Sequence, residues 1–473
     1  MASHPSRNPP LPRAAKLLGL SLLAFALIAP SRAAAAPRQA YVPGTVIVGY
    51  APHAGEGAVR TSARAVGAQI STATAGAPRV RVLHVPIGEV RATVARLRRR
   101  RDVAYAAPDP IAHASALAPG AFPNDPGIVG FPGGLAGLQW NFFGPFGVNA
   151  QQAWANVAAA GSAGGRGVRI AVLDTGVAYR NAGRFRASPD FAGTRFVAGH
   201  DFVAGTGLPL DREPQGHGTH VTGTIAETTD NGIGVSGLAW GATIVPVRVL
   251  DAHGYGDATT IARGIRYAAR HGAQVINMSL EFSTSVRDTE IPDILHAIRF
   301  AHHRGAVVVA SAGNEGEATV AYPARAGLAL SVGATTSSGC LADFSNDGVG
   351  LDLVAPGGGD DADISRDPNC RPGTQGSDVY QETYAHAPAT FGLPSGFTGT
   401  SMAAPHVSAA AALVFASRVL GARPTPDQVV CRLKATARPL GLAGPNRIYG
   451  YGLVDAAAAT SPAVQTPACV TAR

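Results

Sequence analysis

The sequence is short of charge, of cysteine and of long apolar segments. Of its 473 residues, 15% are Asp, Glu, Lys or Arg and 46% are hydrophobic. This balance excludes an intrinsically disordered chain, which combines high charge with little apolar content. The four cysteines all lie in the last third, and their spacings match no compact zinc knuckle. A chain of this length is expected to fold as two or three units.

The one long apolar run lies near the N-terminus and is too short to span a bilayer. Leu17 to Ile28 is interrupted only by Gly19 and Ser21, whereas a membrane helix needs roughly 20 apolar residues. Basic residues precede the run and the small residues Ala33 to Ala36 follow it, which is the order of a cleavable export signal. We therefore predict a signal peptide over residues 1–35 and a secreted protein. An uncleaved membrane anchor is the alternative.

The net charge of +8 does not indicate a nucleic-acid partner. Residues 1–115 hold 15 Lys and Arg against 4 Asp and Glu, whereas the remainder holds 24 against 27. If the first part is removed, the working protein is slightly acidic. Neither nucleic acid nor an anionic membrane is then an expected partner.

Two regions of different pattern follow the signal. Residues 36–115 contain strand candidates at Val42–Tyr50, Arg81–Val85 and Val103–Tyr105, a helix candidate at Glu89–Arg101, and a linker beginning at Pro108-Asp109-Pro110. From Gly165 onward, short β-branched runs alternate with helical patterns. This alternation predicts a parallel sheet covered by helices on both faces, a three-layer α/β fold. We expect a small α+β domain over 36–115 and the α/β domain over 116–473.

Three motifs carry residues suited to nucleophilic catalysis. Asp174 directly follows an apolar strand, His217 stands between two glycines at a helix start, and Ser401 opens an Ala-rich helix. Each alone has an ordinary structural interpretation, such as a helix cap. Together they supply what acyl transfer needs: a hydroxyl nucleophile, an imidazole to take its proton and a carboxylate to orient the imidazole. Asn314, in Ser311-Ala312-Gly313-Asn314, can donate a hydrogen bond to an oxyanion, as can the Ser401 N–H.

The order Asp, His, Asn, Ser and the residues around each resemble the subtilisin family of serine proteases, from about Gln139 to Ala459. The resemblance implies that Asp174 orients His217, that His217 is general base and then acid, that Ser401 is the nucleophile and that Asn314 stabilises the oxyanion. His220 and His406 belong to the same motifs and are expected to be structural. Residues 42–114 resemble the family's propeptide, an intramolecular chaperone and inhibitor cut off near Ala114–Ala118.

The resemblance also implies substrate contacts. Segments that flank the substrate's P1 side chain match Ser279, Leu280, Ser311, Ala312 and Gly313, and Ala321 falls at the floor of an apolar pocket. Glu281 stands where the family usually has Gly. It would attract a basic P1 residue if it pointed into the cleft, but the polar sequence after it leads us to expect that it points to solvent.

A structural calcium ion is a further implication of the resemblance. The family's site matches Asp190 and Asn231, with the backbone carbonyls of Thr229, Ile233 and Val235, and oxygen donors suit calcium. An Asx turn without metal is the alternative. The acidic stretch 357–394 is expected to be a disulfide-tied surface insertion; a second metal loop is its alternative.

An even number of cysteines in an exported chain indicates disulfides. Sequence proximity suggests the pairs Cys340–Cys370 and Cys431–Cys469, although four cysteines allow three pairings.

We therefore expect a monomeric, secreted serine endopeptidase that acts on proteins or peptides and is inhibited by its own propeptide. A catalytically dead binding protein would lack one of the four catalytic residues, and all four are present. An esterase of the α/β-hydrolase class would need Gly-x-Ser-x-Gly and the order Ser, acid, His. A metallohydrolase would need a carboxylate or third histidine at zincin spacing from His217 and His220, which the sequence lacks.

Overall fold

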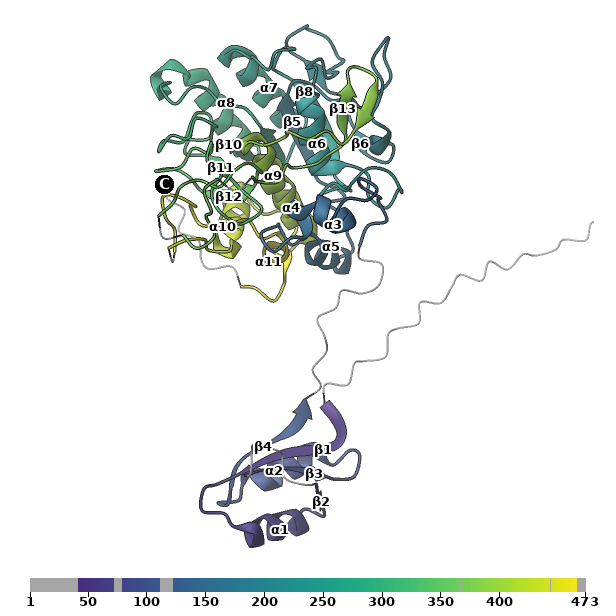
Figure 1. The fold of residues 1–473 in the computed structure, drawn as a ribbon, viewed down its shortest axis with the longest axis vertical. Helices are drawn as coiled ribbons and strands as arrows, with labels where there is room; N and C mark the ends of the chain where they lie inside the picture. Colours follow the sequence, from purple (N-terminus) through teal and green to yellow (C-terminus); the bar gives the residue numbers. More distant parts are fainter. Residues whose placement is uncertain are drawn as a thin grey trace, which may run out of the picture. The chain divides into compact units, whose positions relative to one another are not determined.

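The structure is a computed structural model of the 473-residue chain. It describes residues 41–71, 79–110, 122–365, 367–373, 375–442 and 444–465. The chain divides into two compact units, Met1–Ala116 and Leu117–Arg473 (Figure 1). The predicted signal peptide, most of the predicted linker and the predicted cleavage region lie outside the described residues.

The first unit is a small α+β domain with a four-stranded antiparallel sheet in the order β2-β3-β1-β4. Alternate apolar residues of the central strand, Val46, Val48 and Tyr50, face the helices and form the core with Leu83 and Leu97. The residues between them are also largely covered, since Thr45 and Gly49 are buried and Ile47 is half-buried. The elements are β1 (Tyr41–Tyr50), α1 (Glu56–Ala65), β2 (Gln69–Ile70), β3 (Val80–His84), α2 (Val90–Arg98) and β4 (Val103–Pro110).

The predicted linker start at Pro108-Asp109-Pro110 is wrong, because these residues complete β4. Pro108 lies opposite Val46 and Pro110 lies opposite Tyr41 of β1. Among the described strands β4 is at the edge of its sheet. An edge strand tolerates proline, since its outward N–H groups need no partner strand.

The second unit is built on a parallel sheet of eight described strands. Seven follow the order β12-β11-β10-β9-β5-β8-β6, and β7 also pairs with β8. All the pairings are parallel. The strands are β5 (Arg169–Asp174), β6 (Arg195–Phe196), β7 (His200–Asp201), β8 (Thr243–Arg248), β9 (Val275–Met278), β10 (Val307–Ser311), β11 (Ala329–Thr335) and β12 (Leu353–Pro356). This is the predicted parallel sheet.

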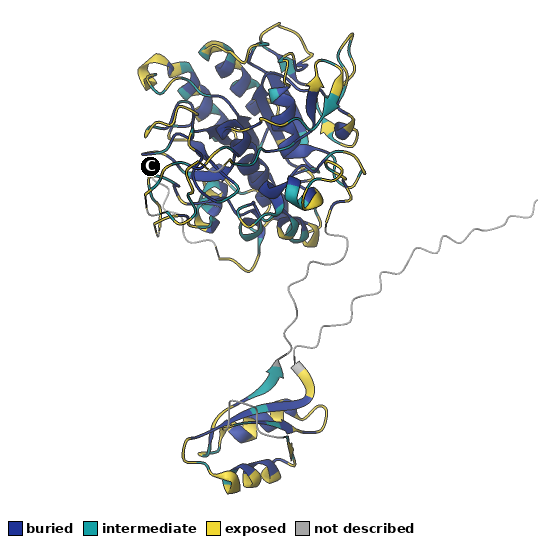
Figure 2. Cartoon of the chain, viewed as in Figure 1, coloured by how far each residue is buried: buried dark blue, intermediate teal, exposed yellow. Residues whose placement is uncertain are grey.

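Helices cover both faces of this sheet, which confirms the three-layer architecture (Figures 1 and 2). Along β5, Ile170 and Val172 pack into one apolar core, whereas Ala171 and Leu173 pack into the other. Apolar residues at every position are therefore required, and this is why the strand reads as a continuous apolar run. The first core includes α5 (Ala150–Ala159), α6 (His217–Ala226), α9 (Thr400–Ser417), α10 (Pro426–Thr436) and α11 (Ala456–Thr460); the second includes α7 (Ala258–Arg270) and α8 (Pro292–His303).

The helix α9 runs through the middle of the first core. It is the one helix in the described ranges that is long and apolar enough to cross a membrane, and 89% of it is buried inside the protein. Figure 2 shows it enclosed by neighbouring elements. Its composition is therefore that of a core helix, and its neighbours on the sheet are β9, β10, β11 and β12.

The stretch 357–394 lies partly on the surface and carries a hairpin, β13 (Thr383–His386) and β14 (Thr390–Gly392). A disulfide of 2.00 Å joins Cys340 to Cys370 at its base, as the sequence suggested. In this stretch, Asp361 Oδ1 accepts hydrogen bonds from Thr336 Oγ1 and Ser338 Oγ at 2.5 Å each. This carboxylate oxygen is therefore already bonded to protein hydroxyls. Cys431 lies in α10, and its predicted partner Cys469 is outside the described residues.

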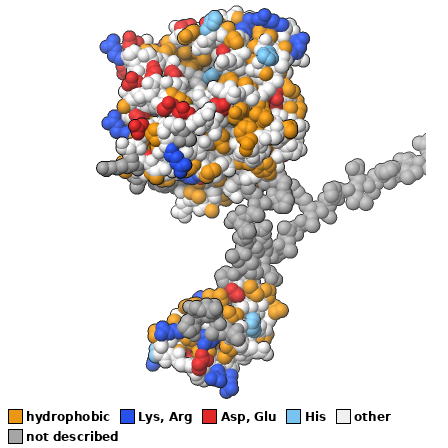
Figure 3. All heavy atoms as spheres, in the orientation of Figure 1, with side chains coloured by type: hydrophobic (Ala, Val, Ile, Leu, Met, Phe, Trp, Pro, Cys, Tyr) orange, Lys and Arg blue, Asp and Glu red, His pale blue; other side chains and the backbone are white. Residues whose placement is uncertain are grey.

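The remaining elements are short. They are α3 (Gly134–Leu138), α4 (Trp140–Phe143) and the 3-10 helices η1 (Pro189–Phe191) and η2 (Asp288–Glu290). On the face drawn in Figure 3, acidic and basic side chains of the second unit are interspersed among hydrophobic and uncharged ones.

Candidate active site

Three strands that are neighbours in the sheet end at the candidate site. Asp174 is the last residue of β5, Ser279 directly follows β9, and Asn314 lies three residues beyond β10. These strands are adjacent in the order β10-β9-β5. Because parallel strands end at the same edge, residues far apart in the sequence meet there, and α/β enzymes place their chemistry at this edge.

Asp174 and His217 form a hydrogen-bonded pair. His217 Nδ1 lies 2.7 Å from Asp174 Oδ1, and the two side chains are 27% and 1% exposed respectively. A carboxylate can only accept, so Nδ1 carries the hydrogen. The neutral ring then has its lone pair on Nε2, the atom able to take a proton.

A buried network fixes the distance between β5 and α6. Asp211 accepts from Thr175 Oγ1 at 2.9 Å and from Thr219 Oγ1 at 2.6 Å, which ties the residue after Asp174 to the first turn of α6. At Gly218, a Cβ atom would overlap the carbonyl oxygen of Gly176 and lie 3.0 Å from Asp174 Oδ1. The glycine after His217 therefore permits the close approach that the pair needs.

Neighbouring carboxylates set the protonation of His217. Burial alone would lower its pKa, but the charge and hydrogen bond of Asp174, followed by the charges of Asp211 and Glu213, raise the pKa above its ordinary value. Glu213 also accepts from the backbone N–H of His217 at 3.1 Å and of Gln215 at 2.9 Å. Its carboxylate thus lies beside the imidazole. Asp211 and Glu213 were not predicted as site residues.

Ser401 is the second residue of α9, where the N–H has no helical carbonyl to bond to. Pro405 lies four residues further and has no N–H, so the Ser401 carbonyl lacks its helical partner. Ser279 Oγ donates to that carbonyl at 2.8 Å. In return, Ser401 Oγ donates to the Ser279 carbonyl at 3.3 Å. Among the described residues, the Ser401 hydroxyl is therefore hydrogen-bonded to Ser279 and not to His217.

Thr400 orients the amide of Asn314. Asn314 Oδ1 accepts from Thr400 N at 2.8 Å and from Thr400 Oγ1 at 3.0 Å, which turns Nδ2 away from the helix. Nδ2 donates to Glu281, at 3.2 Å to Oε1 and 3.4 Å to Oε2. The amide that was predicted to bind an oxyanion therefore faces a carboxylate in this structure.

The candidate site opens into one cavity of about 370 Å³. His217, Ser401 and Asn314 share it with Glu281 and Glu213, and its other lining residues are Thr175, Gln215, Leu250, His253, Gly254, Tyr255, Gly256, Ile261, Ser279, Leu280 and Phe282. The expectation that Glu281 points to solvent is wrong, because Asn314 holds its half-buried carboxylate at the cavity. Burial raises the pKa of Glu281, and the charge of Glu315 adds to this effect.

The predicted P1-pocket residues divide into two groups. Ser279, Leu280 and Glu281 line the cavity. Ser311, Ala312, Gly313 and Ala321 are buried and are not among its lining residues. Ser311 connects this second group to the cavity, because its Oγ donates to the carbonyl of the lining residue Leu280 at 3.1 Å. Within the group, Ala321 N donates to the Ala312 carbonyl at 2.8 Å.

Comparisons with known proteins agree with this geometry. The model of the subtilase family matches residues 165–452. The chain belongs to the subtilase family. The model of the fervidolysin N-terminal prodomain matches residues 28–109, so the first unit is a prodomain. The protein is a subtilisin-like serine protease.

Individual relatives show how far the similarity extends. Subtilisin Savinase from Lederbergia lenta is 39% identical over 63% of this chain and 91% of its own length. The cell wall-associated protease of Bacillus subtilis is 42% identical over 52% of this chain but only 23% of that protein. Among solved structures, a protease from Pseudoalteromonas arctica PAMC 21717 superposes with a TM-score of 0.56 at 30% identity, covering 72% of this chain and 98% of the other.

The other two histidines of this subtilase's motifs are structural, as expected. His220 donates from Nε2 to the Val379 carbonyl at 2.8 Å and stacks on Phe397, and burial lowers its pKa to about 3. His406 bonds to the Met402 carbonyl at 2.9 Å and to Asn141 Nδ2 at 2.8 Å, and burial lowers its pKa to about 4. Both rings are neutral and their nitrogens face the protein interior.

Three of the predicted calcium ligands of this subtilase, Asp190, Asn231 and Val235, are in contact beside other buried carboxylates. Asp190 Oδ1 accepts from Asn231 Nδ2 at 2.7 Å, and its Oδ2 accepts from the Val235 N–H at 3.1 Å. Burial raises the pKa of Asp190 to about 8, and the charge of Glu382 adds to this effect. Thr229 Oγ1 is buried and has no hydrogen-bond partner among the described residues.

Further carboxylates surround this site. Asp125, Glu227 and Glu382 are all buried, and none of the ion pairs between described residues includes them or Asp190. A buried negative charge without a counter-charge is costly, so the region suits a hard cation. In the described ranges no three Asp, Glu, His or Cys side chains converge enough to hold an ion alone. A calcium ion would therefore need the backbone carbonyls of Thr229, Ile233 and Val235.

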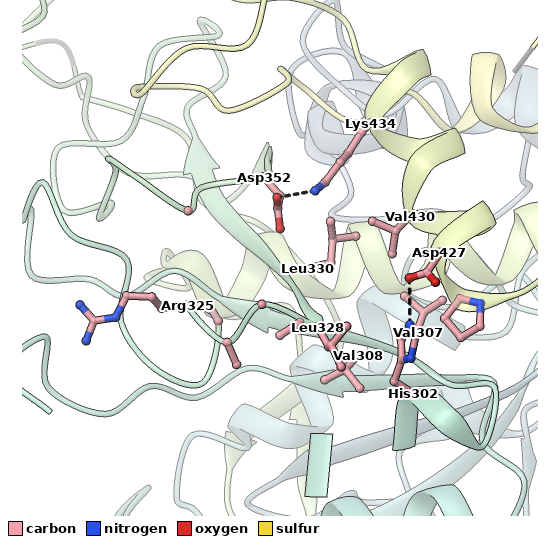
Figure 4. A pocket seen from close by; sticks show the side chains of 16 residues that line it. His302, Val307, Val308, Arg325, Leu328, Leu330, Asp352, Asp427, Val430 and Lys434 are labelled. Atoms are coloured by element: carbon pink, nitrogen blue, oxygen red, sulfur yellow. Dashed lines mark hydrogen bonds and ion pairs between the residues drawn. The ribbon is translucent and has the colours of Figure 1, made fainter. Parts of the chain in front are cut away.

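A second cavity, of about 170 Å³, lies at the opposite edge of the sheet (Figure 4). It is lined by the first residues of β10 and β11 and by one side of α10. Two pairs of its charged groups interact, since His302 lies 2.9 Å from Asp427 and Lys434 lies 2.6 Å from Asp352. Arg325, which also lines it, donates to the Val286 carbonyl at 2.8 Å. None of Asp174, His217, Asn314 and Ser401 lines this cavity, so it is not the candidate catalytic site.

Proposed function

We propose that this subtilase is a secreted endopeptidase that cleaves internal peptide bonds through an acyl-enzyme on Ser401. The observation that carries the proposal is the 2.7 Å pair of His217 and Asp174 opening into a cavity shared with Ser401 and Asn314. The cavity is open, as cleavage within a longer chain requires.

Each residue has a defined role in the proposed reaction. Ser401 Oγ attacks the substrate carbonyl while His217 Nε2 takes the hydroxyl proton, and the amine then leaves with that proton. Asp174 remains ionised and stabilises the imidazolium. The oxyanion accepts from Asn314 Nδ2 and from the Ser401 N–H in the first turn of α9, where the helix dipole is positive. Water then releases the acyl group by the same steps.

The substrate strand is proposed to lie along Ser279, Leu280 and Glu281. The P1 side chain would enter the region enclosed by Ser311, Ala312, Gly313 and Ala321, whose small side chains leave an apolar space. The buried positions of Ala312 and Ala321 support an apolar environment for this side chain. Ser401 Oγ must turn from the Ser279 carbonyl toward His217 when substrate binds. Catalytic hydrogen bonds are often long or misaligned without substrate and shorten in the complex.

The prodomain is proposed to inhibit the enzyme until it is cut off near Ala114–Ala118. The separate core of the first unit supports its removal as one piece. Residues 1–35 would be removed on export, leaving 36–115 as propeptide and 116–473 as the peptidase, which acts as a monomer without nucleic acid or membrane. The relative named as cell wall-associated supports an extracellular place of action.

Calcium is proposed to bind at Asp190, Asn231, Thr229, Ile233 and Val235. Its contribution would be structural, because these residues lie outside the cavity that holds Ser401. The ion would neutralise the buried carboxylates of Asp190, Glu227 and Glu382.

The proposed function is tested by incubating the purified protein with an unfolded protein substrate and sequencing the products. We expect new termini inside the substrate chain with the wild-type protein and none with Ser401→Ala. Release of single terminal residues would contradict an endopeptidase, and equal cleavage by Ser401→Ala would contradict the nucleophile.

A further inference from the structure

The position of Glu281 conflicts with oxyanion binding as the structure stands. Asn314 Nδ2 donates to both oxygens of this carboxylate, while Asn314 Oδ1 is held by Thr400. The Thr400 bonds therefore hold Nδ2 beside the carboxylate. A substrate oxyanion bound to the same NH2 group would lie next to this carboxylate, and the two negative charges would repel each other.

When His217 is neutral, as it must be to act as a base, the cavity contains no cation to relieve this repulsion. Its sixteen lining residues include two carboxylates, Glu213 and Glu281, and no Lys or Arg. Glu213 already accepts two backbone N–H groups. Glu281 takes part in none of the ion pairs between described residues. The charge of Glu315 raises the pKa of Glu281, and the charge of His217, when it is protonated, lowers it.

Glu315 does not supply the missing partner either. Its Oε2 accepts from Asn346 Nδ2 at 3.0 Å and its Oε1 accepts from the Thr284 N–H at 3.4 Å, so it stays beside Glu281 as a second negative charge. The site thus has a half-buried carboxylate with no Lys or Arg partner, in the same cavity as the catalytic serine. A charge-assisted bond from a substrate Lys or Arg matches this environment.

We propose that Glu281 is a specificity-determining residue that recruits substrates with a cationic side chain and, until such a group binds, occupies the oxyanion donor Asn314. A guanidinium or ammonium group entering the cavity pairs with Glu281 and draws its carboxylate from Asn314 Nδ2. The donor is then free for the oxyanion. The inference rests on the proposed function, and it adds that cleavage depends on a positive charge near the scissile bond.

The test compares peptides that differ by one charge. Fluorogenic peptides carry Arg or its neutral isostere citrulline at each of the four positions before the cleaved bond. For the wild-type enzyme we expect kcat/KM to favour Arg by about 10-fold or more at one position, as for a hydrogen bond between charged groups. Glu281→Gln should bring that ratio close to one.

Glu281→Gly gives a readout that a purely structural role would not produce. It should lower kcat/KM for the Arg peptide and raise it above wild type for the citrulline peptide, because Asn314 is released. Glu317→Gln is the matched control: it removes one exposed negative charge from the same loop as Glu315 and lies outside the cavity, so the Arg preference should remain.

Two results would overturn the inference. One is cleavage by the wild-type enzyme with no Arg preference at any of the four positions. The other is an Arg preference that persists in Glu281→Gln, which would place the cation elsewhere. Either result leaves the proposed protease standing, whereas a wild-type protein that cleaves no peptide at all contradicts the protease itself.

Discussion

At the scale of single residues, hydrogen bonds from neighbouring residues fix the side chains of the active site and leave few of their polar atoms for a substrate. Asp174, Asn314 and Ser401 each have their positions set by neighbours that are themselves bonded: Thr175, Thr400 and Ser279. His217 Nε2 faces the substrate as the proton acceptor, and Asn314 Nδ2 serves the oxyanion once the Glu281 carboxylate moves from it. The two atoms define where the proton and the negative charge go during the reaction.

Asn314→Ala removes one oxyanion donor while leaving the nucleophile and base in place. We expect kcat to fall by about 10²–10³-fold with little change in KM, because the donor acts on the transition state. Steady-state kinetics with one peptide substrate measure this. An unchanged kcat would exclude Asn314 from the reaction.

The acid limb of the pH profile should reflect the raised pKa of His217. The imidazole is inactive as a base while protonated, so kcat/KM rises with pH as it loses its proton. Because neighbouring carboxylates raise its pKa, the midpoint should lie above the ordinary value of about 6.5. Glu213→Gln should move the midpoint down by about 0.2–0.7 pH unit, as expected for one screened charge. Glu317→Gln should leave it in place, and a midpoint that Glu213→Gln does not move would contradict the role of Glu213.

The motifs around Asp174, His217 and Ser401 could be predicted from the sequence because their residues are close along the chain. The roles of Asp211 and Glu281 could not. Asp211 stands 36 residues from Thr175, and Glu281 stands 33 residues from Asn314. Contacts between residues so far apart in the sequence form only when the strands pair in the sheet. For Glu281, the polar sequence that follows it wrongly indicated an exposed side chain.

At the scale of elements, the alternation of apolar strands and helical patterns was sufficient to predict a parallel sheet covered by helices on both faces, but not the short strands β6, β7 and β12. Strands buried on both faces, such as β5 and β10, have unmistakable apolar runs. The helix α1 was not predicted, since Gly57 in its first turn lowers helix propensity. The edge strand β4 was shortened in the prediction because its prolines indicated a linker.

The disulfide Cys340–Cys370 ties the stretch 357–394 to the sheet. It closes a loop of 30 residues, which in the chain-entropy account corresponds to about 3–4 kcal/mol of stability. Replacing both cysteines by serine should lower the thermal midpoint by several degrees and leave kcat nearly unchanged. Peptide mapping without reductant checks this pair together with Cys431–Cys469. Another pairing, or free thiols, would refute the predicted connectivity.

At the scale of the whole molecule, a prodomain with its own core precedes the peptidase unit. If Ser401 carries out its own processing, Ser401→Ala should accumulate as a precursor that begins near residue 36. Mass spectrometry of the purified variant measures its N-terminus. Adding a trace of wild-type enzyme should restore cleavage if the junction itself is intact. A mature Ser401→Ala protein without added enzyme would show that another protease does the processing.

The proposed calcium ion would stabilise the folded molecule and take no part in its chemistry. A ligand that binds only the native state raises the thermal midpoint, so chelation should lower that midpoint in the wild-type protein. Asp190→Asn should melt at the same temperature with and without chelator. Identical melting of the wild-type protein in both conditions would remove calcium from the account.

The central claim is that Ser401 is a nucleophile activated by His217. A fluorophosphonate probe reacts with such a serine and forms a stable adduct whose position is found by peptide mass spectrometry. The account predicts one adduct, on Ser401, that is formed by the mature wild-type protein and is absent from His217→Ala. An unlabelled wild-type protein, or an adduct on a different residue, would contradict it.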